Sequence, residues 1–422
     1  MLSQTRIINI VFLLNVFCFL KLIPFIKPEV QAYGGLISVI YLLRNSNKIN
    51  KVFWFWLVYL SLFSIYNLCI VGFDKYIVLT FITFVIPVAS FFHFYEGLHK
   101  ITPKVFKYVV YVWTGLAFSQ LFFPGLLKFF FLDKLFTYLI PRFSSGSLAE
   151  WNRGVVIFTP EPSYAAHIIF LFISMSIYMR YQEKISKKAF RIITGCNIFM
   201  IVATASGTAG VIVALLIFFY LCFTFNLKSL IVTCVTVFFA QFFFFDLRFI
   251  SVFSQVFKEI NSTNEFAFSS LLNVATALGS TREFSVSVAY SSLFNGNWFG
   301  YGIGSWSYLF LEKMFEFDYN PDVVSRFRRD GLWNLKPYSY GALVAFDLGL
   351  LGYSLFIFMF RKVFMKFSSI SAIGKSIVSV SVLMILFHTL VSLPVYWITL
   401  SIGLTLIKNR KSEYIKKTKV VY

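Results

Sequence analysis

The sequence predicts an all-α, polytopic integral membrane protein with about twelve transmembrane helices. Of its 422 residues, 58% are hydrophobic and only 13% are charged, a balance that excludes an ordinary soluble domain. Apolar runs of about 17–25 residues recur along the chain, and this length crosses a hydrocarbon layer of roughly 30 Å. The runs are too long and too uniform for the alternating strands of a membrane barrel, so the spans are expected to be helices.

The expected spans follow one another with short connections, apart from two long external loops. The first run is expected to remain as a span, because Lys21 and Lys27 follow it and no small-residue cleavage site does. With no repeat and no low-complexity linker, residues 1–422 form one predicted integral domain. The expected spans are 7–23, 29–44, 52–72, 76–94, 105–123, 164–181, 191–205, 207–225, 229–246, 338–360, 375–392 and 393–408.

Basic residues are unevenly distributed between the two predicted sides of the membrane. If the N-terminus is inside, most of the 38 Lys and Arg residues fall on the inner side, together with only Glu96, Glu183 and Glu413. Cytoplasmic segments retain Lys and Arg, so both termini are predicted to be cytoplasmic. The net charge of +20 is therefore a topology signal, and no nucleic-acid partner is predicted. The basic tail, 408–422, is expected to touch anionic membrane lipid.

Two long loops lie on the predicted outer side, at 124–163 and 247–337. Both are rich in aromatic residues and Leu, and segments such as "RFISVFSQVFKEI" and "SWSYLFLEKMFEF" have an apolar stripe at helical spacing. We expect short amphipathic helices there. A channel or carrier would place ionisable groups inside its spans, whereas here Asp347 is nearly the only one away from the span ends. This distribution indicates a site at the outer membrane boundary.

The first loop offers an acid and two arginines. Glu161 lies between Pro160 and Pro162, which predicts an extended backbone followed by the first turn of a helix. Its carboxylate is either a helix cap or an acid positioned beside a substrate. Arg142 and Arg153 are candidates for binding phosphate oxygens through the guanidinium fork, and a salt bridge or an interfacial anchor is the alternative for each.

The second loop offers further cations and a run of glycines. Arg282 follows a Gly-Ser-Thr turn and begins a helical pattern, where free N–H groups favour an anion. Arg326, Arg328, Arg329 and Lys336 precede the next span as ligand contacts or as snorkelling groups. The glycines at 300, 302 and 304 are expected to form a tight turn rather than a nucleotide loop.

Histidine and cysteine spacing predicts no metal site and no cofactor. The four histidines are scattered, and His167 and His388, near the outer ends of spans, fit packed residues better than a catalyst. The five cysteines all fall within spans, without a metal-binding spacing or a disulfide framework.

Several ordered segments resemble those of the bacterial O-antigen polymerases of the Wzy type, which share a superfamily with the O-antigen ligases. The segments are "TPEPSYAA", "TASGTAG", "GSTREFSVSVAYSSLFNGNWFGYGIGS" and "YGALVAFDLGLLGY", over roughly residues 140–355. A clean Arg-x10-Gly spacing, described for loops of this family, is absent. A ligase is expected to carry a histidine late in the large loop, where this chain has Tyr338 and Tyr340, so the polymerases are the closer match.

The resemblance implies an inner-membrane glycosyltransferase that moves a growing glycan from undecaprenyl diphosphate onto another lipid-linked repeat unit at the periplasmic face. It implies an undecaprenyl-diphosphate-linked oligosaccharide as substrate and a chain-length regulator as a possible partner. The residues that match the pattern are Arg153, Glu161 and Arg282, as catalytic candidates. The expected substrate-binding residues are Arg142, Arg326, Arg329, Tyr338, Tyr340 and His167.

The chemistry of such a transfer needs two groups that the loops contain. A base takes the proton of the attacking hydroxyl, and cations stabilise the departing diphosphate in an oxocarbenium-like transition state. Glu161 is the predicted base, with Glu283, Asp330 or His167 as alternatives. Two other functions remain open: a ligase that acts on lipid A core, and a polysaccharide or lipid-oligosaccharide transporter without catalysis.

Overall fold

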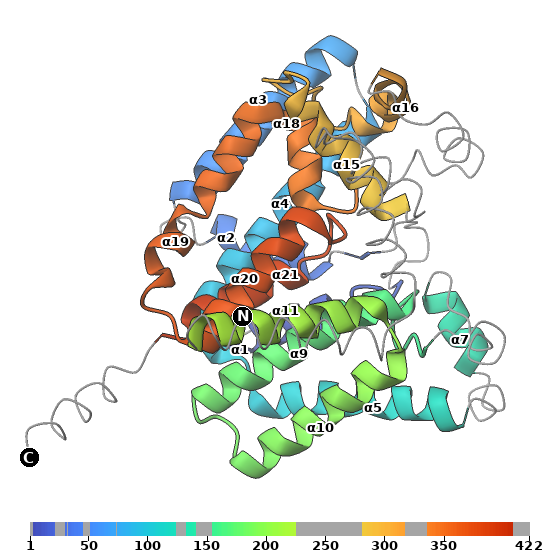
Figure 1. The fold of residues 1–422 in the computed structure, drawn as a ribbon, viewed down its shortest axis with the longest axis vertical. Helices are drawn as coiled ribbons and strands as arrows, with labels where there is room; N and C mark the ends of the chain where they lie inside the picture. The colour runs from blue at the N-terminus through green and yellow to red at the C-terminus, as the bar shows by residue number, and fades with distance from the viewer. Residues whose placement is uncertain are drawn as a thin grey trace, which may run out of the picture.

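The computed structural model describes residues 3–21, 30–31, 33–44, 51–72, 74–123, 132–140, 154–224, 281–316 and 336–407. Within these ranges the chain is helical, with a single antiparallel bridge between Ile370 and Ile407 (Figure 1). The all-α prediction is therefore confirmed. The longer helices are α1 (Gln4–Val16), α2 (Tyr33–Arg44), α3 (Lys51–Val71), α4 (Lys75–Gly97), α5 (Pro103–Phe122), α9 (Pro162–Tyr181), α10 (Lys187–Thr204), α11 (Gly207–Thr224), α15 (Thr281–Phe294), α16 (Trp306–Glu316), α18 (Tyr340–Met359), α20 (Ala372–Phe387) and α21 (Val395–Thr405), with the shorter α7 (Leu132–Leu139) and α19 (Arg361–Phe367).

Six of the described helices are long and apolar enough to cross a membrane: α3, α4, α5, α9, α11 and the run Tyr340–Phe367. They are compatible with a multi-pass membrane protein. Helices also occupy the expected spans 7–23, 29–44, 375–392 and 393–408, but α1, α2, α20 and α21 have only 13, 12, 16 and 11 residues. A straight helix needs about 20 residues to cross the hydrocarbon layer. The expected span 229–246 lies outside the described residues.

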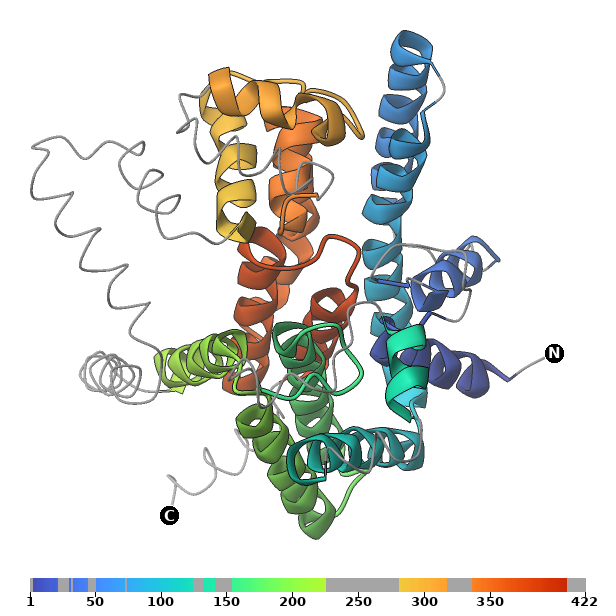
Figure 2. The same cartoon turned by 90° about the vertical axis from the view of Figure 1, so that its right-hand side faces the viewer.

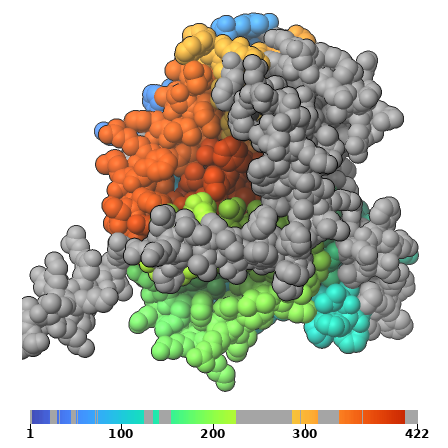
Figure 3. Space-filling view, in the orientation of Figure 1, coloured from blue at the N-terminus to red at the C-terminus, as the bar shows by residue number. Residues whose placement is uncertain are grey.

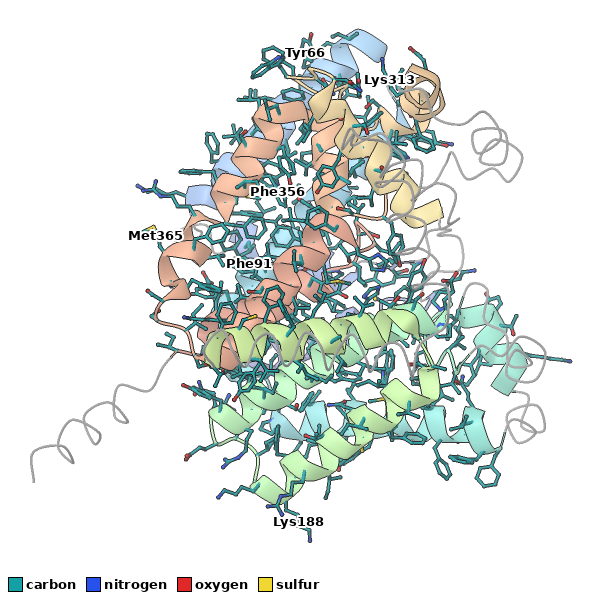
Figure 4. The ribbon with its side chains drawn as sticks, in the orientation of Figure 1. Tyr66, Phe91, Lys188, Lys313, Phe356 and Met365 are labelled. Atoms are coloured by element: carbon teal, nitrogen blue, oxygen red, sulfur yellow. The ribbon has the colours of Figure 1, made fainter. Side chains whose placement is uncertain are left out.

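The core is an aromatic and aliphatic cluster in which Trp397 of α21 has a central place. Its ring lies 5.1 Å from that of Tyr340, 6.2 Å from Phe356 and 6.3 Å from Phe91. Figure 4 shows Phe91 and Phe356 in the middle of the molecule. Helix α9 is the most enclosed candidate span, with 78% of its window buried, whereas α11 has 11% and α3 has 22%. The exposed apolar faces of α3 and α11 are the surfaces that a bilayer would cover.

Helix α18 is bent at Gly349, whose φ of 63° and ψ of −163° are not helical. Figure 1 shows its two halves diverging from this bend. The loop 295–305 packs on the bend, because Leu350 N donates to Asn297 O at 3.0 Å and Gly302 N donates to Asp347 O at 2.9 Å. A Cβ at Gly300 would lie 2.2 Å from Asp347 O. The glycines thus form the expected tight turn, and the turn supports a broken helix.

Asp347 is fully buried, and its carboxylate has a structural role at this bend. Gly304 N donates to Oδ2 at 3.0 Å, and Ser305 Oγ donates to Oδ1 at 3.2 Å. The carboxylate therefore binds the backbone and hydroxyl groups at the start of α16, where free N–H groups favour a negative charge. The one acid expected inside a span is used to hold the loop against α18.

The two ends of the molecule have different contacts. At one end, which we call the basic end, Lys100 donates to Gln4 Oε1, Lys184 Nζ to His99 O and Lys366 Nζ to Tyr95 OH. These lysines come from segments that the charge pattern assigns to one side of the membrane. Figure 4 shows Lys188, from the same set, and Lys313 of the second loop at opposite ends of the molecule.

At the other end, which we call the loop end, residues from each long loop or its border are bonded to a neighbouring segment. Lys21 N donates to Leu139 O at 2.7 Å, and Thr389 N donates to Tyr338 O at 2.9 Å. Figure 2 shows the hairpin of α3 and α4 (blue) standing beside α15, α16 and α18 (yellow and orange). In Figure 3, α18 and α19 form the left edge of the visible face, above α10. Helix α16 covers most of "SWSYLFLEKMFEF"; "RFISVFSQVFKEI" lies outside the described residues.

Candidate functional site

The segment that enters α9 is fixed by contacts with two other helices. Val155 N donates to Ala203 O at 2.9 Å, and Ile157 N donates to Gln120 Oε1 at 2.8 Å. A Cβ at Gly154 would lie 1.8 Å from Thr204 O, so this close approach requires glycine. Gly154 and Val155, just before the "TPEPSYAA" segment, are therefore anchored against the end of α10, where the "TASGTAG" junction begins.

Glu161 occupies the position that its neighbouring prolines predict. It is the N-cap residue of α9 with an extended backbone (φ −145°, ψ 151°), and Pro162 begins the helix. Its side chain makes no capping hydrogen bond to the backbone of α9. Instead, Ser163 Oγ donates to Glu161 Oε2 at 3.3 Å, and the side chain is partly exposed. The carboxylate therefore does not cap the backbone of α9, and its role as an acid beside a substrate stays a prediction.

One turn into α9 begins a group of rings that we call the His–Tyr cluster: Tyr164, His167, Tyr338, His388 and Tyr396. The rings of Tyr164 and Tyr338 are stacked, with centroids 6.3 Å apart and 14° between their planes. The ring of His388 lies 5.2 Å from that of Tyr338 and 6.2 Å from that of His167.

Within this cluster His167 and His388 differ in exposure. His167 is fully buried, and its Nδ1 is hydrogen-bonded to the hydroxyl of Tyr396. His388 is partly exposed, because it is the C-cap residue at the end of α20. The cluster thus connects the interior of the bundle to the surface of the loop end. Two titratable rings and three hydroxyl-bearing rings in one contiguous group are suited to proton transfer, and only the ring of His388 is partly exposed.

The segment 336–339, just before α18, joins the cluster to the second loop. Tyr338 N donates to Ser285 Oγ at 3.2 Å, which places the first turns of α15 beside this segment. Arg282 lies in the first turn of α15, one turn before Ser285. The start of α15 and the entrance of α9 therefore both contact segment 336–339. For Arg282 the structure describes the backbone but not the side chain.

Lys336 extends from the same segment in another direction. Its Nζ donates to Thr83 Oγ1 of α4 at 2.9 Å. Burial lowers the pKa of its ammonium group from the ordinary 10.5 to about 8, and the charge of Asp347 opposes this effect. Its hydrogen-bond partner is a neutral hydroxyl, so within the described part of the chain this lysine makes no ion pair, and Asp347 acts on it only through its charge.

Tyr340, expected to bind substrate, is fully buried in the core. Its hydroxyl donates to Phe84 O of α4 at 2.8 Å, and its ring packs edge-on against Phe84. Tyr340 thus occupies a buried position between α18 and α4, which fits a packing role.

The structure describes the predicted arginines only in part. Arg142, Arg153, Arg326 and Arg329 lie outside the described residues, and so does Asp330. For Arg282 and Glu283 the backbone is described and the side chain is not. Among the described residues no three His, Cys, Asp or Glu side chains form a group that could hold a metal ion.

Sequence reasoning did not select His388 or Tyr396 as site residues, and it left Lys336 open between a ligand contact and a snorkelling group. His167 and Tyr396 are 229 residues apart, so no local spacing relates them. A signal was available in the predicted topology, which places the start of span 164–181 and the end of span 375–392 on the same side of the membrane. Comparisons of the chain with protein-family models, with curated proteins and with solved structures find no match.

Proposed function

We propose that the protein is a membrane glycosyltransferase that polymerises lipid-linked oligosaccharide, an O-antigen polymerase of the Wzy type. In this proposal it transfers a growing glycan from undecaprenyl diphosphate to the terminal sugar of another lipid-linked repeat unit. Twelve spans, a bacterial inner-membrane location and cytoplasmic termini belong to the same proposal, as does a chain-length regulator as a possible partner. The described helices are compatible with a multi-pass membrane protein, and the function goes beyond that observation.

The observation that carries the proposal is the meeting of three family-like segments at the loop end. The entrance of α9, with Glu161 and Tyr164, meets segment 336–339 through the stack of Tyr164 on Tyr338. The first turns of α15 meet the same segment through Ser285. Partly exposed titratable groups from α9 and α20 lie at this end, whereas Asp347 is occupied by its contacts with the loop. This arrangement fits one external site better than a polar path through the bilayer.

The reaction assigns a task to each group. The oxygen of the acceptor hydroxyl attacks the anomeric carbon, the bond from that carbon to the diphosphate oxygen breaks, and the diphosphate leaves with the electron pair. Glu161 takes the hydroxyl proton, with His388 added to His167 as an alternative base. Arg153 and Arg282 stabilise the charge on the diphosphate; by analogy with a single oxyanion donor, one such contact is worth roughly 3 kcal/mol.

The direct test is reaction of the purified full-length protein with lipid-linked repeat units in nanodiscs, with and without a chelator. We expect a ladder of glycans on the lipid. Glu161→Gln should lower the rate at least about 100-fold, the lower limit for loss of a general base. Glu312→Gln, which changes an exposed acid of α16, is the matched control and should leave the ladder unchanged.

Cells that lack their own polymerase give the second test. Arg153→Ala and Arg282→Ala variants should produce lipopolysaccharide with a single repeat unit while repeat units still reach the periplasm. Full-length chains in both variants would contradict the assigned sites. Cytoplasmic accumulation of repeat units would indicate a transporter, and loss of all glycan attachment to lipid A core would indicate a ligase.

A further inference from the structure

Lys336 is a cation without an anionic partner in the described structure. Its side chain lies between the start of α18 and α4, is partly buried, and donates to the Thr83 hydroxyl at 2.9 Å. The Thr83 hydroxyl also lies 2.7 Å from Leu79 O, to which it donates its proton, so its oxygen is free to accept from the ammonium. Among the described residues Lys336 makes no ion pair, and Asp347 is the charged group that acts on it from α18.

Such an arrangement is costly unless something offsets the charge. Removing an ammonium group from water is unfavourable, and a buried charge is normally paired. At the basic end Lys366 is exposed where it donates to Tyr95 OH, whereas burial also lowers the pKa of Lys184, which donates to His99 O. Lys336 has a pKa lowered to about 8, which means that burial makes its charged form less stable than usual. A strongly perturbed cation beside a cluster of titratable groups is a typical feature of a binding site.

The position of Lys336 relative to the His–Tyr cluster defines the kind of ligand. Only Pro337 separates it from Tyr338, whose ring contacts Tyr164 and His388 and whose carbonyl accepts from Thr389 N at 2.9 Å. From the same short segment, Lys336 therefore contacts α4, and Tyr338 contacts Tyr164 and His388. A ligand at this segment would have its anionic part near the ammonium and a ring near the aromatic cluster.

We propose that Lys336 is a phosphate-binding residue, whose ammonium exchanges the Thr83 hydroxyl for an oxygen of a phosphate ester. The choice of ester rests on the proposed function: the diphosphate of a polyprenyl-linked sugar would lie at Lys336, with its sugar toward the His–Tyr cluster. The same chemistry would accept a phospholipid headgroup, and the experiment distinguishes these two sources. No covalent step is assigned to Lys336.

The test measures binding of farnesyl diphosphate, a short polyprenyl diphosphate without sugar, to the full-length protein in phosphatidylcholine nanodiscs. Lys336→Met should weaken binding at least about 30-fold, in line with a charge-assisted hydrogen bond of roughly 2 kcal/mol. The matched control is Lys313→Met, which removes another lysine of the second loop, one whose ammonium lies 4.8 Å from the ring of Tyr301. This control should bind as the unchanged protein does.

A pH series separates the charge of Lys336 from its shape. The ammonium loses its proton as the pH rises through about 8, so affinity should fall between pH 7 and pH 9. Lys336→Arg keeps a positive charge over this range, and its affinity should not show that fall. Equal affinity of the Lys336→Met variant, or equal pH dependence of the Lys336→Arg variant, would overturn the proposal.

A second measurement uses the unchanged protein, so it does not depend on whether a variant folds. A lysine with a lowered pKa is acetylated by acetic anhydride faster than ordinary lysines at pH 7.5, because more of it is neutral. Farnesyl diphosphate should protect Lys336, but not Lys313, as measured by mass spectrometry. If phosphatidylglycerol nanodiscs protect Lys336 and farnesyl diphosphate does not, the site binds phospholipid rather than the diphosphate donor, which overturns the proposed ester and retains the phosphate site.

This inference and the proposed function can fail separately. Farnesyl diphosphate binding that depends on Lys336, in a protein that makes no glycan ladder, would support the site and reject the polymerase. A normal ladder from the Lys336→Met variant would support the polymerase and reject the site.

Discussion

Two buried histidines with the same local chemistry lie in different parts of the molecule. His93 of α4 is 2% exposed; its Nδ1 is 3.0 Å from Ser38 Oγ, and its ring is stacked on that of Tyr41 at 4.2 Å. His167 of α9 is fully buried, and its Nδ1 is hydrogen-bonded to the Tyr396 hydroxyl. Each histidine thus has a hydroxyl partner from a helix distant in sequence and an aromatic neighbour.

The surroundings of the two histidines differ. Helix α2 packs so closely beside His93 that a Cβ at Gly35 would lie 2.1 Å from Ile86 Cγ2. His167 instead continues into the partly exposed His388 and, through Tyr338, into the segment that carries Lys336. A buried histidine bonded to a hydroxyl is therefore no evidence of function by itself. The connection to partly exposed titratable groups separates a candidate site from a packed core.

The largest expected effect tests that connection at His388. Replacing His388 by Gln keeps a polar side chain of similar size but removes the titratable ring. We expect the glycan ladder to form about 100-fold more slowly, which is the lower limit for loss of an acid–base group. The pH profile of the remaining activity should also change, a result that a purely packing role would not produce.

The matched variant is His93→Gln, which makes the same chemical change in the enclosed region. It should lower the thermal stability in detergent while the rate per folded molecule stays within about threefold. Comparable losses of activity in the two variants would remove the distinction between the regions, and the cluster would then be a packing feature like its counterpart.

A second prediction concerns the close packing that encloses His93. Gly35→Ala places a methyl group against Ile86, a β-branched residue whose rotamer is restricted in a helix. Overpacking of this kind costs about 1–3 kcal/mol, and the melting temperature should fall. In Gly115→Ala the new methyl group meets nothing within 4 Å, and the higher helix propensity of Ala should stabilise α5 by up to about 1 kcal/mol. Equal effects in the two variants would contradict the packing described for α2.

The sequence predicts most helix positions because apolar runs are local features. It does not predict the bend in α18. Hydropathy carries no information about the φ of Gly349 or about hydrogen bonds with Asn297 and Gly304, which belong to another segment. The sequence also overestimates the lengths of α1 and α21, because apolar residues continue past the helix ends into packed turns.

The candidate site likewise combines a residue whose backbone is determined locally with residues whose role depends on distant partners. Glu161 is predicted in place because two adjacent prolines determine its backbone locally. A role for His388 is not predicted, and that of Lys336 is left open, because both depend on partners that the folded chain supplies: the rings of His167 and Tyr338 for His388, and the Thr83 hydroxyl for Lys336.

The smallest expected effect tests the two hydroxyl partners themselves. Tyr396→Phe and Ser38→Ala each remove the oxygen bonded to a buried histidine Nδ1. Each should destabilise the protein by about 0.5–1.5 kcal/mol, the usual net value of one hydrogen bond, as measured by unfolding in detergent. If the His–Tyr cluster acts as a unit, only Tyr396→Phe should also lower the glycosyltransferase rate, by several-fold, because the orientation of His167 would affect His388. A stability loss without a rate change in both variants would mean that the Tyr396 hydroxyl serves packing alone, and His388 would then act without support from His167.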